Sequence, residues 1–93
     1  MAKANYQRTD DAFYETILKL QNVEECVQFF KDICSPNELS SIEQRFEVAK
    51  LLSEGEVYLD IAQKTGASSA TISRVNRMLN NGESCASKVL QRE

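Results

Sequence analysis

The stretch YLDIAQKTGASSATISRVNRML, Tyr58 to Leu79, decides the fold that we predict for this chain. Apolar residues recur at helical spacing on both sides of Gly66, which indicates two short amphipathic helices over residues 57–65 and 69–80. Glycine adopts positive φ without strain, so we expect Gly66 in the left-handed region that a tight turn requires. Ala62 is small enough for the two helices to approach each other closely. The spacing predicts a helix-turn-helix over this stretch.

The second helix of this pair separates into an inward and an outward face. The residues expected to pack the two helices on each other and on the domain are Ile61, Ala67, Ile72 and Val75. The outward face is small and polar near its start, where Ser68 or Ser69 would be the N-cap, and basic farther along. In a recognition helix the first residues reach base edges, while longer side chains reach phosphates. The predicted DNA-binding residues are Lys64, Ser68, Ser69, Ala70, Ser73, Arg74, Arg77 and Asn80.

Charge is segregated along the chain, whose net charge is −3. Residues 1–60 hold twelve acidic and six basic residues, whereas residues 61–93 hold two and five. Only the field near a docking surface has to be positive for DNA binding. Lys64, Arg74 and Arg77 are therefore candidate phosphate contacts. An ordinary helical hairpin with a solvated polar face is the alternative interpretation.

Composition excludes several classes of protein. With 93 residues, 42% of them apolar, the chain suits one domain, 1–93, and is too apolar to be disordered by default. No apolar run approaches the roughly 18 residues of a membrane span, and no signal peptide is recognisable, so we expect a cytoplasmic protein with no membrane partner. Three cysteines and no histidine predict neither a disulfide framework nor a metal site. No catalytic arrangement of residues is apparent, so we expect no cofactor and no enzyme.

The rest of the chain is predicted to be helical, because glycine and proline are scarce and no strand pattern appears. Residues 1–8 are polar and expected to be frayed. Residues 9–54 are expected to form three helices, residues 57–80 the helix-turn-helix, and residues 83–93 a tail or a short helix. The predicted fold class is therefore all-α, with five to six short helices.

The third helix has the clearest start in the sequence, SPNE at residues 35–38. Ser35 at the N-cap, Pro36 at the first helical position and Glu38 two residues later would form a capping box. Gly55 is expected to end the helix. The side chains predicted to point inward from it are Leu39, Ile42, Phe46, Ala49 and Leu52.

From Cys34 to Leu79 the chain resembles the trp repressor superfamily, in particular its TrpR-related branch of YerC/YecD-type proteins. The matching text is SPNE, QRFEVAKLLSEGE and IAQKTGASSATISRVNRML, of which GASSATISR is the most specific part. About half of the chain is covered well, and the first two helices match in layout rather than in residues. The resemblance implies an intertwined homodimer in which the helices of residues 9–54 interlock and present two recognition helices about one turn of DNA apart.

The apolar content of the first three helices agrees with a dimer. Phe13, Phe29, Phe30 and Phe46 offer more apolar surface than a domain of this size readily covers alone. A monomeric bundle that uses these side chains internally is the alternative.

The resemblance also implies where a small-molecule effector would bind. In the tryptophan-responsive members two arginines flank the indole and a hydroxyl residue helps to hold the amino acid, and Arg45, Arg74 and Ser35 match these positions. Val75 and Met78 replace a glycine and a serine there, so larger side chains project into the place of the indole. We therefore expect that any effector is not tryptophan. Arg45 could instead pair with a neighbouring glutamate, Glu43 or Glu47, or with a partner subunit.

These observations predict a homodimeric transcriptional regulator that acts as a repressor on a two-fold symmetric operator in double-stranded DNA. The alternative is a protein-interaction module built on a helix-turn-helix scaffold, which the acidic first 60 residues would suit. Salt dependence separates the two, because each neutralised phosphate contributes a slope near −0.9 to the logarithm of DNA affinity against that of salt concentration.

Overall fold

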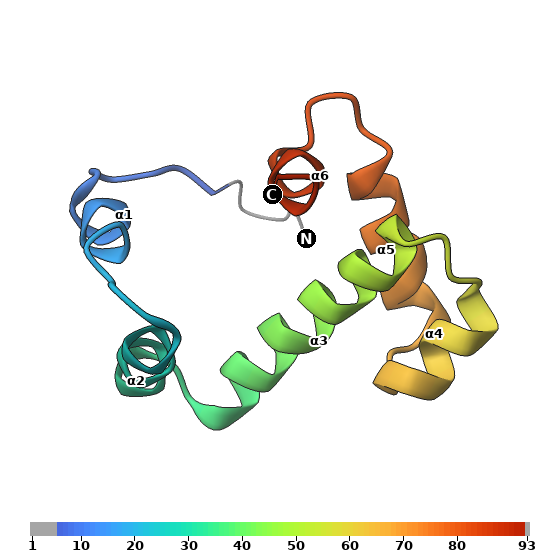
Figure 1. Ribbon diagram of the computed structural model, residues 1–93, viewed down its shortest axis with the longest axis horizontal. Helices are drawn as coiled ribbons and strands as arrows, with labels where there is room; N and C mark the ends of the chain where they lie inside the picture. The colour runs from blue at the N-terminus through green and yellow to red at the C-terminus, as the bar shows by residue number, and fades with distance from the viewer. Residues whose placement is uncertain (1–5, 93) are drawn as a thin grey trace, which may run out of the picture. The chain divides into compact units, whose positions relative to one another are not determined.

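The fold is all-α, as predicted. A computed structural model describes residues 6–92, which contain six helices and no strand (Figure 1). Residues 1–5, where we predicted most of a frayed N-terminus, lie outside the described part, and residues 6–11 hold no helix. None of the helices within residues 6–92 is long and apolar enough to cross a membrane. The helices are α1 (Ala12–Ile17), α2 (Val23–Ile33), α3 (Pro36–Ser53), α4 (Tyr58–Thr65), α5 (Ser69–Leu79) and α6 (Cys85–Leu90).

The chain divides into two compact units, and the first, residues 1–34, contains α1 and α2. Asn22 caps α2, because its side-chain oxygen accepts the Glu25 backbone N–H at 2.8 Å. The Phe13 ring of α1 stacks on the Phe29 ring of α2, with 6.3 Å between the ring centroids. Neither helix contains a buried residue, and Leu18, just after α1, is 84% exposed. The first unit therefore carries apolar side chains that remain largely accessible.

The second unit, residues 35–93, begins with the predicted capping box. The Glu38 N–H donates to Ser35 Oγ at 3.2 Å, and the Ser35 N–H donates to Glu38 Oε1 at 2.8 Å. Donation from the Ser35 backbone stabilises the carboxylate and lowers the pKa of Glu38 below its usual value. Pro36 occupies the first position of α3, where its missing N–H leaves no bond unmade.

The far end of α3 is closed by a left-handed glycine. Gly55 has φ 86°, which glycine adopts without a steric cost. The Gly55 N–H donates to the Leu52 carbonyl oxygen at 3.0 Å, and the Glu56 N–H donates to the Leu51 carbonyl oxygen at 3.1 Å. This pair of bonds is a Schellman motif, which satisfies two carbonyl groups of the last helical turn.

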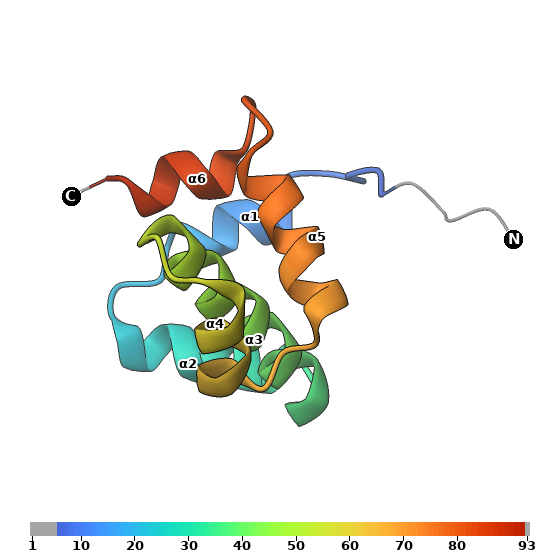
Figure 2. The same cartoon turned by 90° about the vertical axis from the view of Figure 1, so that its right-hand side faces the viewer.

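The core of the second unit lies where α4 and α5 pack on the C-terminal half of α3 (Figure 1). Because α4 and α5 each present a narrow apolar stripe, they bury it against the same part of α3. The link between α4 and α5 is short, as Figure 2 shows. The buried residues are Val48, Ala49 and Leu51 of α3, Ile61 of α4, Ala67 of the turn, and Ile72 and Val75 of α5. All four residues that we predicted to pack the helix-turn-helix are among them.

The predicted inward stripe of α3 is confirmed only in its C-terminal part. Ala49 is buried and Leu52 packs partly buried against the core, whereas Ile42 is 49% and Phe46 is 55% exposed. The core also uses Val48 and Leu51, which lie outside the predicted stripe. Helix α3 therefore carries apolar residues on two faces, one of which packs within the unit while the other stays accessible.

Within residues 83–92 the chain forms the short helix α6 rather than an irregular tail. Ser84 caps it, because its Oγ accepts the Ser87 N–H at 3.1 Å. Leu90 packs partly buried against the core. Helix α6 therefore packs against the same core, in contact with α3.

Candidate nucleic-acid interface

The turn of the helix-turn-helix has the predicted geometry. Gly66 ends α4 in the left-handed conformation, with φ 74°, and its N–H donates to the Ala62 carbonyl oxygen at 2.9 Å. Beside it, Thr65 Oγ1 donates to the Ile61 carbonyl oxygen at 2.7 Å and accepts the Ala67 N–H at 3.1 Å. These bonds fix the direction in which the chain leaves α4, and they hold Ala67 in the core.

A side chain of α3 also reaches this turn. Gln44 Nε2 donates to the Thr65 carbonyl oxygen at 3.1 Å, in a half-buried position. A Cβ atom added at Gly66 would lie 3.9 Å from the same nitrogen, which is an ordinary van der Waals distance. Gln44 was not among the predicted residues, because its partner lies 21 residues along the chain and no local spacing indicates the contact. The turn is thus tied directly to α3.

Of the two serines predicted as caps, Ser68 is the N-cap of α5. Its Oγ accepts the Thr71 N–H at 3.2 Å and donates to Thr71 Oγ1 at 3.1 Å. The hydroxyl group of Ser69 makes no hydrogen bond within the described chain, 6–92. The cap therefore occupies one serine and leaves the next one accessible to an external partner.

The residues at the middle of the inward face of α5 are buried, as predicted. Ile72 is 1% and Val75 is 5% exposed, so both side chains face the core. Ser73, predicted to bind DNA from the outward face, is half-buried, and Met78 is 39% exposed. The exposed residues of the predicted outward face are Ser69, Ala70, Arg74, Arg77 and Asn80. Helix α5 thus offers an accessible surface that is small and polar at its start and basic farther along.

The three basic residues of the helix-turn-helix differ in their surroundings. Lys64 Nζ lies 2.8 Å from Glu56 Oε1, and this hydrogen-bonded ion pair raises the pKa of Lys64 above its usual value. Arg74 and Arg77 form no ion pair with any residue between 6 and 92. Glu56 was not predicted as a partner, because it lies outside α4 and shares no helical spacing with Lys64. Within the described part of the chain, the two guanidinium groups of α5 therefore have no counter-charge in an ion pair.

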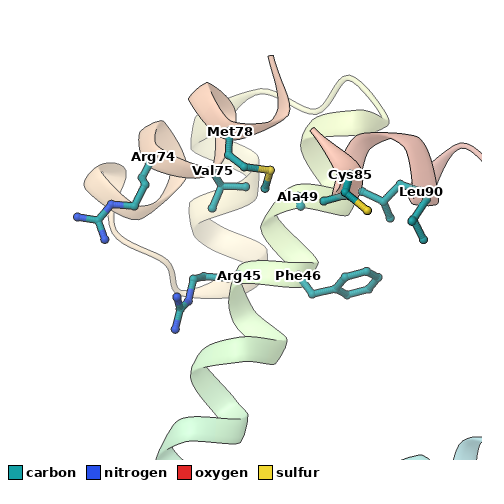
Figure 3. Close-up of a pocket in the computed structure, with 10 residues that line it drawn as sticks. Arg45, Phe46, Ala49, Arg74, Val75, Met78, Cys85 and Leu90 are labelled. Atoms are coloured by element: carbon teal, nitrogen blue, oxygen red, sulfur yellow. The ribbon is translucent and has the colours of Figure 1, made fainter. Parts of the chain in front are cut away.

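An open apolar pocket of about 600 Å³ lies between α3, α5 and α6. Figure 3 shows the guanidinium groups of Arg45 and Arg74 at one side of this pocket and the ring of Phe46 at the other. Val75 and Met78 project from α5 toward α3, and α6 contributes Cys85, Ala86, Val89 and Leu90. Arg45 and Arg74 also line a smaller pocket of about 260 Å³, with Ser41, Gln44, Thr71 and Val75.

The predicted ligand-pocket residues are only partly brought together. Arg45 and Arg74 line the same two pockets, whereas Ser35 lines neither. Ser35 lies at the N-terminus of α3, and the rise of an α-helix places it roughly 15 Å along the axis from Arg45. Its hydroxyl group is engaged in the capping box.

Arg45 pairs with neither neighbouring glutamate within the described residues. Its Nε donates to the Ser41 carbonyl oxygen at 3.4 Å, one helical turn earlier. Its guanidinium group therefore keeps most of its donors available at the pocket.

Comparison with known proteins gives a consistent result. Residues 8–93 match the family model described as Trp repressor protein. The uncharacterized protein YerC of Bacillus subtilis (strain 168) is 49% identical over 82 residues, which cover 88% of this chain and 79% of YerC.

Two solved structures share the fold. A TrpR-like protein from Eubacterium eligens ATCC 27750 superposes with a TM-score of 0.82 at 52% identity, over 88% of this chain and 84% of that chain. A candidate Trp repressor from Staphylococcus aureus superposes with a TM-score of 0.80 at 48% identity, over 86% of this chain and 80% of that chain.

Proteins of this family are DNA-binding regulators and not enzymes. The prediction of a DNA-binding regulator is therefore confirmed at the level of the family. The family match spans nearly all of the chain, and the relatives are about half identical to it. The resemblance carried by GASSATISR and its neighbours is therefore confirmed. The chain belongs to the Trp repressor family, as a TrpR-related protein of the YerC type.

Proposed function

We propose that this protein is a cytoplasmic transcriptional repressor that binds a two-fold symmetric site in double-stranded DNA as a homodimer. The observation that carries the proposal is the outward face of α5. There, Ser69 and Ala70 are exposed at the helix start, and no ion pair within residues 6–92 neutralises Arg74 or Arg77. Small side chains at the start allow the helix to approach base edges, and the guanidinium groups reach phosphates.

Two observations support the homodimer. Helices α1 and α2 contain no buried residue, and α3 leaves Ile42 and Phe46 about half exposed. Apolar surface of this extent is characteristic of a protein interface. A closed dimer is two-fold symmetric, so it would present two copies of α5 to two related half-sites. On this proposal both units of the chain, residues 1–93, act as one functional domain.

The proposed contacts follow the order of residues along α5. Ser69, Ala70 and the half-buried Ser73 would approach base edges or a thymine methyl group. Arg74, Arg77 and Asn80 would contact phosphates farther along the helix. Ser68 would act indirectly, because its cap bond with Thr71 orients the first turn of α5 toward the DNA.

The direct test is the substitution Arg77→Ala. Removing one phosphate-binding group from each protomer should weaken binding at least tenfold and reduce the slope of log affinity against log salt by about 0.9 per protomer. The measurement is fluorescence anisotropy of a duplex selected from random sequence, over a salt series. Lys88→Ala removes the same charge from the exposed side of α6 and should change neither quantity appreciably. If the wild type prefers this duplex no more than an acidic polymer, and Arg77→Ala changes nothing, a protein-interaction module becomes the better description.

The proposed effector, where one acts, is a molecule other than tryptophan. Val75 is buried against the core and Met78 lines the apolar pocket, so both occupy space next to Arg74. Ser35 lies too far along α3 to join Arg45 in the same chain, so it could contribute only from a second copy.

We expect tryptophan to leave the melting temperature unchanged in a thermal-shift assay. A ligand that bound the folded protein, at a concentration 100 times its Kd, would add about 2.7 kcal/mol of stability and be seen readily. A clear, saturable shift with tryptophan that Arg74→Ala abolishes would contradict the proposal.

A further inference from the structure

We propose that Glu56 limits the number of DNA phosphates that each protomer engages, by holding the Lys64 side chain in an ion pair and leaving the phosphate contacts to Arg74 and Arg77. The inference rests on the proposed function and makes Glu56 a positioning residue of the interface. It assigns opposite roles to basic residues that look equivalent in the sequence.

The position of Glu56 is fixed by the end of α3. Gly55 takes up positive φ, and the Glu56 N–H closes the Schellman motif by donating to the Leu51 carbonyl oxygen at 3.1 Å. The side chain of Glu56 is 28% exposed, about half the exposed fraction of Lys64, which is 55%. The carboxylate is therefore the better fixed of the two partners, and the flexible lysine is drawn to it.

Lys64 lies in the last turn of α4, and its surroundings are acidic. The Nζ atom is 2.8 Å from Glu56 Oε1, and the charges of Asp60 and Glu54 act on the same ammonium group. The pKa of Lys64 is raised chiefly by the hydrogen bond with Glu56. A phosphate that approached this ammonium group would also approach three carboxylates, so the attraction would be largely offset.

The basic residues of α5 lack such an acidic environment. Arg74 and Arg77 have no carboxylate partner among residues 6–92, so their charges are available to displace the counterions of DNA. Lys64 already has a counter-charge from within the protein, so its contribution to the salt dependence should be small. Glu56 would thereby restrict the phosphate-binding surface to α5.

A double-mutant cycle tests this role, with Glu56→Gln, Lys64→Ala and the combined variant. Glutamine keeps the size of the side chain and removes its charge, which frees Lys64 to contact a phosphate. We expect Glu56→Gln to bind the selected duplex roughly fivefold more tightly, with a salt slope steeper by about 0.9 per protomer. Lys64→Ala alone should change affinity less than twofold, and in the combined variant the gain should disappear.

Glu54→Gln is the matched control. It makes the same charge change two residues away, at the C-cap of α3, and Glu54 forms no hydrogen bond or ion pair with Lys64. Any gain from this substitution should be smaller, because Glu54 acts on Lys64 through its charge alone and does not hold the side chain by a hydrogen bond. Circular dichroism of each variant verifies that its helix content is unchanged.

The outcomes separate the two proposals. If Lys64→Ala weakens binding as much as Arg77→Ala, Lys64 contacts a phosphate in the wild type and the inference is overturned. Equal, Lys64-independent gains from Glu56→Gln and Glu54→Gln would overturn it too, since they would reflect net charge alone. Failure of the wild type and every variant to bind any duplex would overturn the proposed function and the inference together.

Discussion

Replacing Gly66 with valine is expected to weaken binding to the selected duplex by at least about 30-fold while leaving the protein folded and dimeric. Gly66 has φ 74°, and a left-handed conformation costs an ordinary residue about 1–2 kcal/mol, with a higher cost for a β-branched side chain. A Cβ atom alone would fit, because its nearest contact among residues 6–92, apart from the two neighbouring residues, is Gln44 Nε2 at 3.9 Å. The expected defect is therefore one of backbone conformation.

The strain acts on DNA binding because the turn sets the direction of α5. A valine would relieve the strain by shifting the turn, and DNA binding would then have to restore the strained geometry in both protomers. About 1.4 kcal/mol corresponds to a tenfold change in affinity, so a cost of about 1–2 kcal/mol in each of the two protomers predicts a loss of roughly 30-fold to 700-fold. Anisotropy titration measures the loss, and sedimentation equilibrium checks the dimer.

Two further substitutions at Gly66 serve as controls. Asparagine visits the left-handed region readily, so Gly66→Asn should retain most of the affinity. Gly66→Ala should be intermediate, because alanine lacks the branched side chain that makes valine worse. A wild-type affinity in Gly66→Val, or a loss in Gly66→Asn as large as that in Gly66→Val, would show that the left-handed turn does not control binding.

Replacing Phe46 with aspartate is expected to convert the dimer into folded monomers. Phe46 is 55% exposed on α3, and it lines the apolar pocket with Val89 and Leu90 of α6. In the proposed dimer a second copy covers this surface, so the substitution would bury an ionised carboxylate without a partner, at a cost of several kcal/mol. Two-fold symmetry introduces the change twice per interface. We therefore expect the dissociation constant of the dimer to rise at least 100-fold.

Sedimentation equilibrium measures this dissociation, and two variants control for it. Phe46→Leu keeps the surface apolar and should remain dimeric. Tyr58→Asp introduces the same acid at an aromatic residue of α4 that is 40% exposed. A negative charge is favourable in the first turn of a helix, so this variant should remain folded and dimeric. A monomeric wild type, or a Phe46→Asp variant as dimeric as the wild type, would refute the proposed interface.

Features that depend on neighbouring residues could be predicted from the sequence. The capping box at Ser35 and the left-handed Gly66 each involve residues within four positions of one another. The local amino-acid sequence is therefore enough to predict these hydrogen bonds. The buried faces of α4 and α5 were also predictable, because each helix has a single apolar stripe and hence one way to pack.

Features that depend on distant residues could not be predicted in the same way. Helix α3 has two apolar faces, and periodicity alone does not tell which packs within the chain, so Phe46 was assigned inward and Val48 was overlooked. The contacts of Gln44 with Thr65 and of Glu56 with Lys64 join separate elements and require the packed structure. Each contact involves a residue at the end of α4, next to the turn. The exposed face of α5 was therefore easier to predict from the sequence than the contacts that hold the turn in place.

Ser68 and Ser69 have different structural roles, and this difference affects which substitutions the protein can tolerate during evolution. Ser68 supplies the cap of α5, whereas Ser69 and Ala70 are exposed and make no side-chain hydrogen bond within residues 6–92. Substitutions at exposed positions without structural partners usually change stability by less than about 0.5 kcal/mol. Mutation and selection can therefore explore new operator preferences at these two positions at little risk to the fold, so related regulators can diverge in their targets while keeping one architecture.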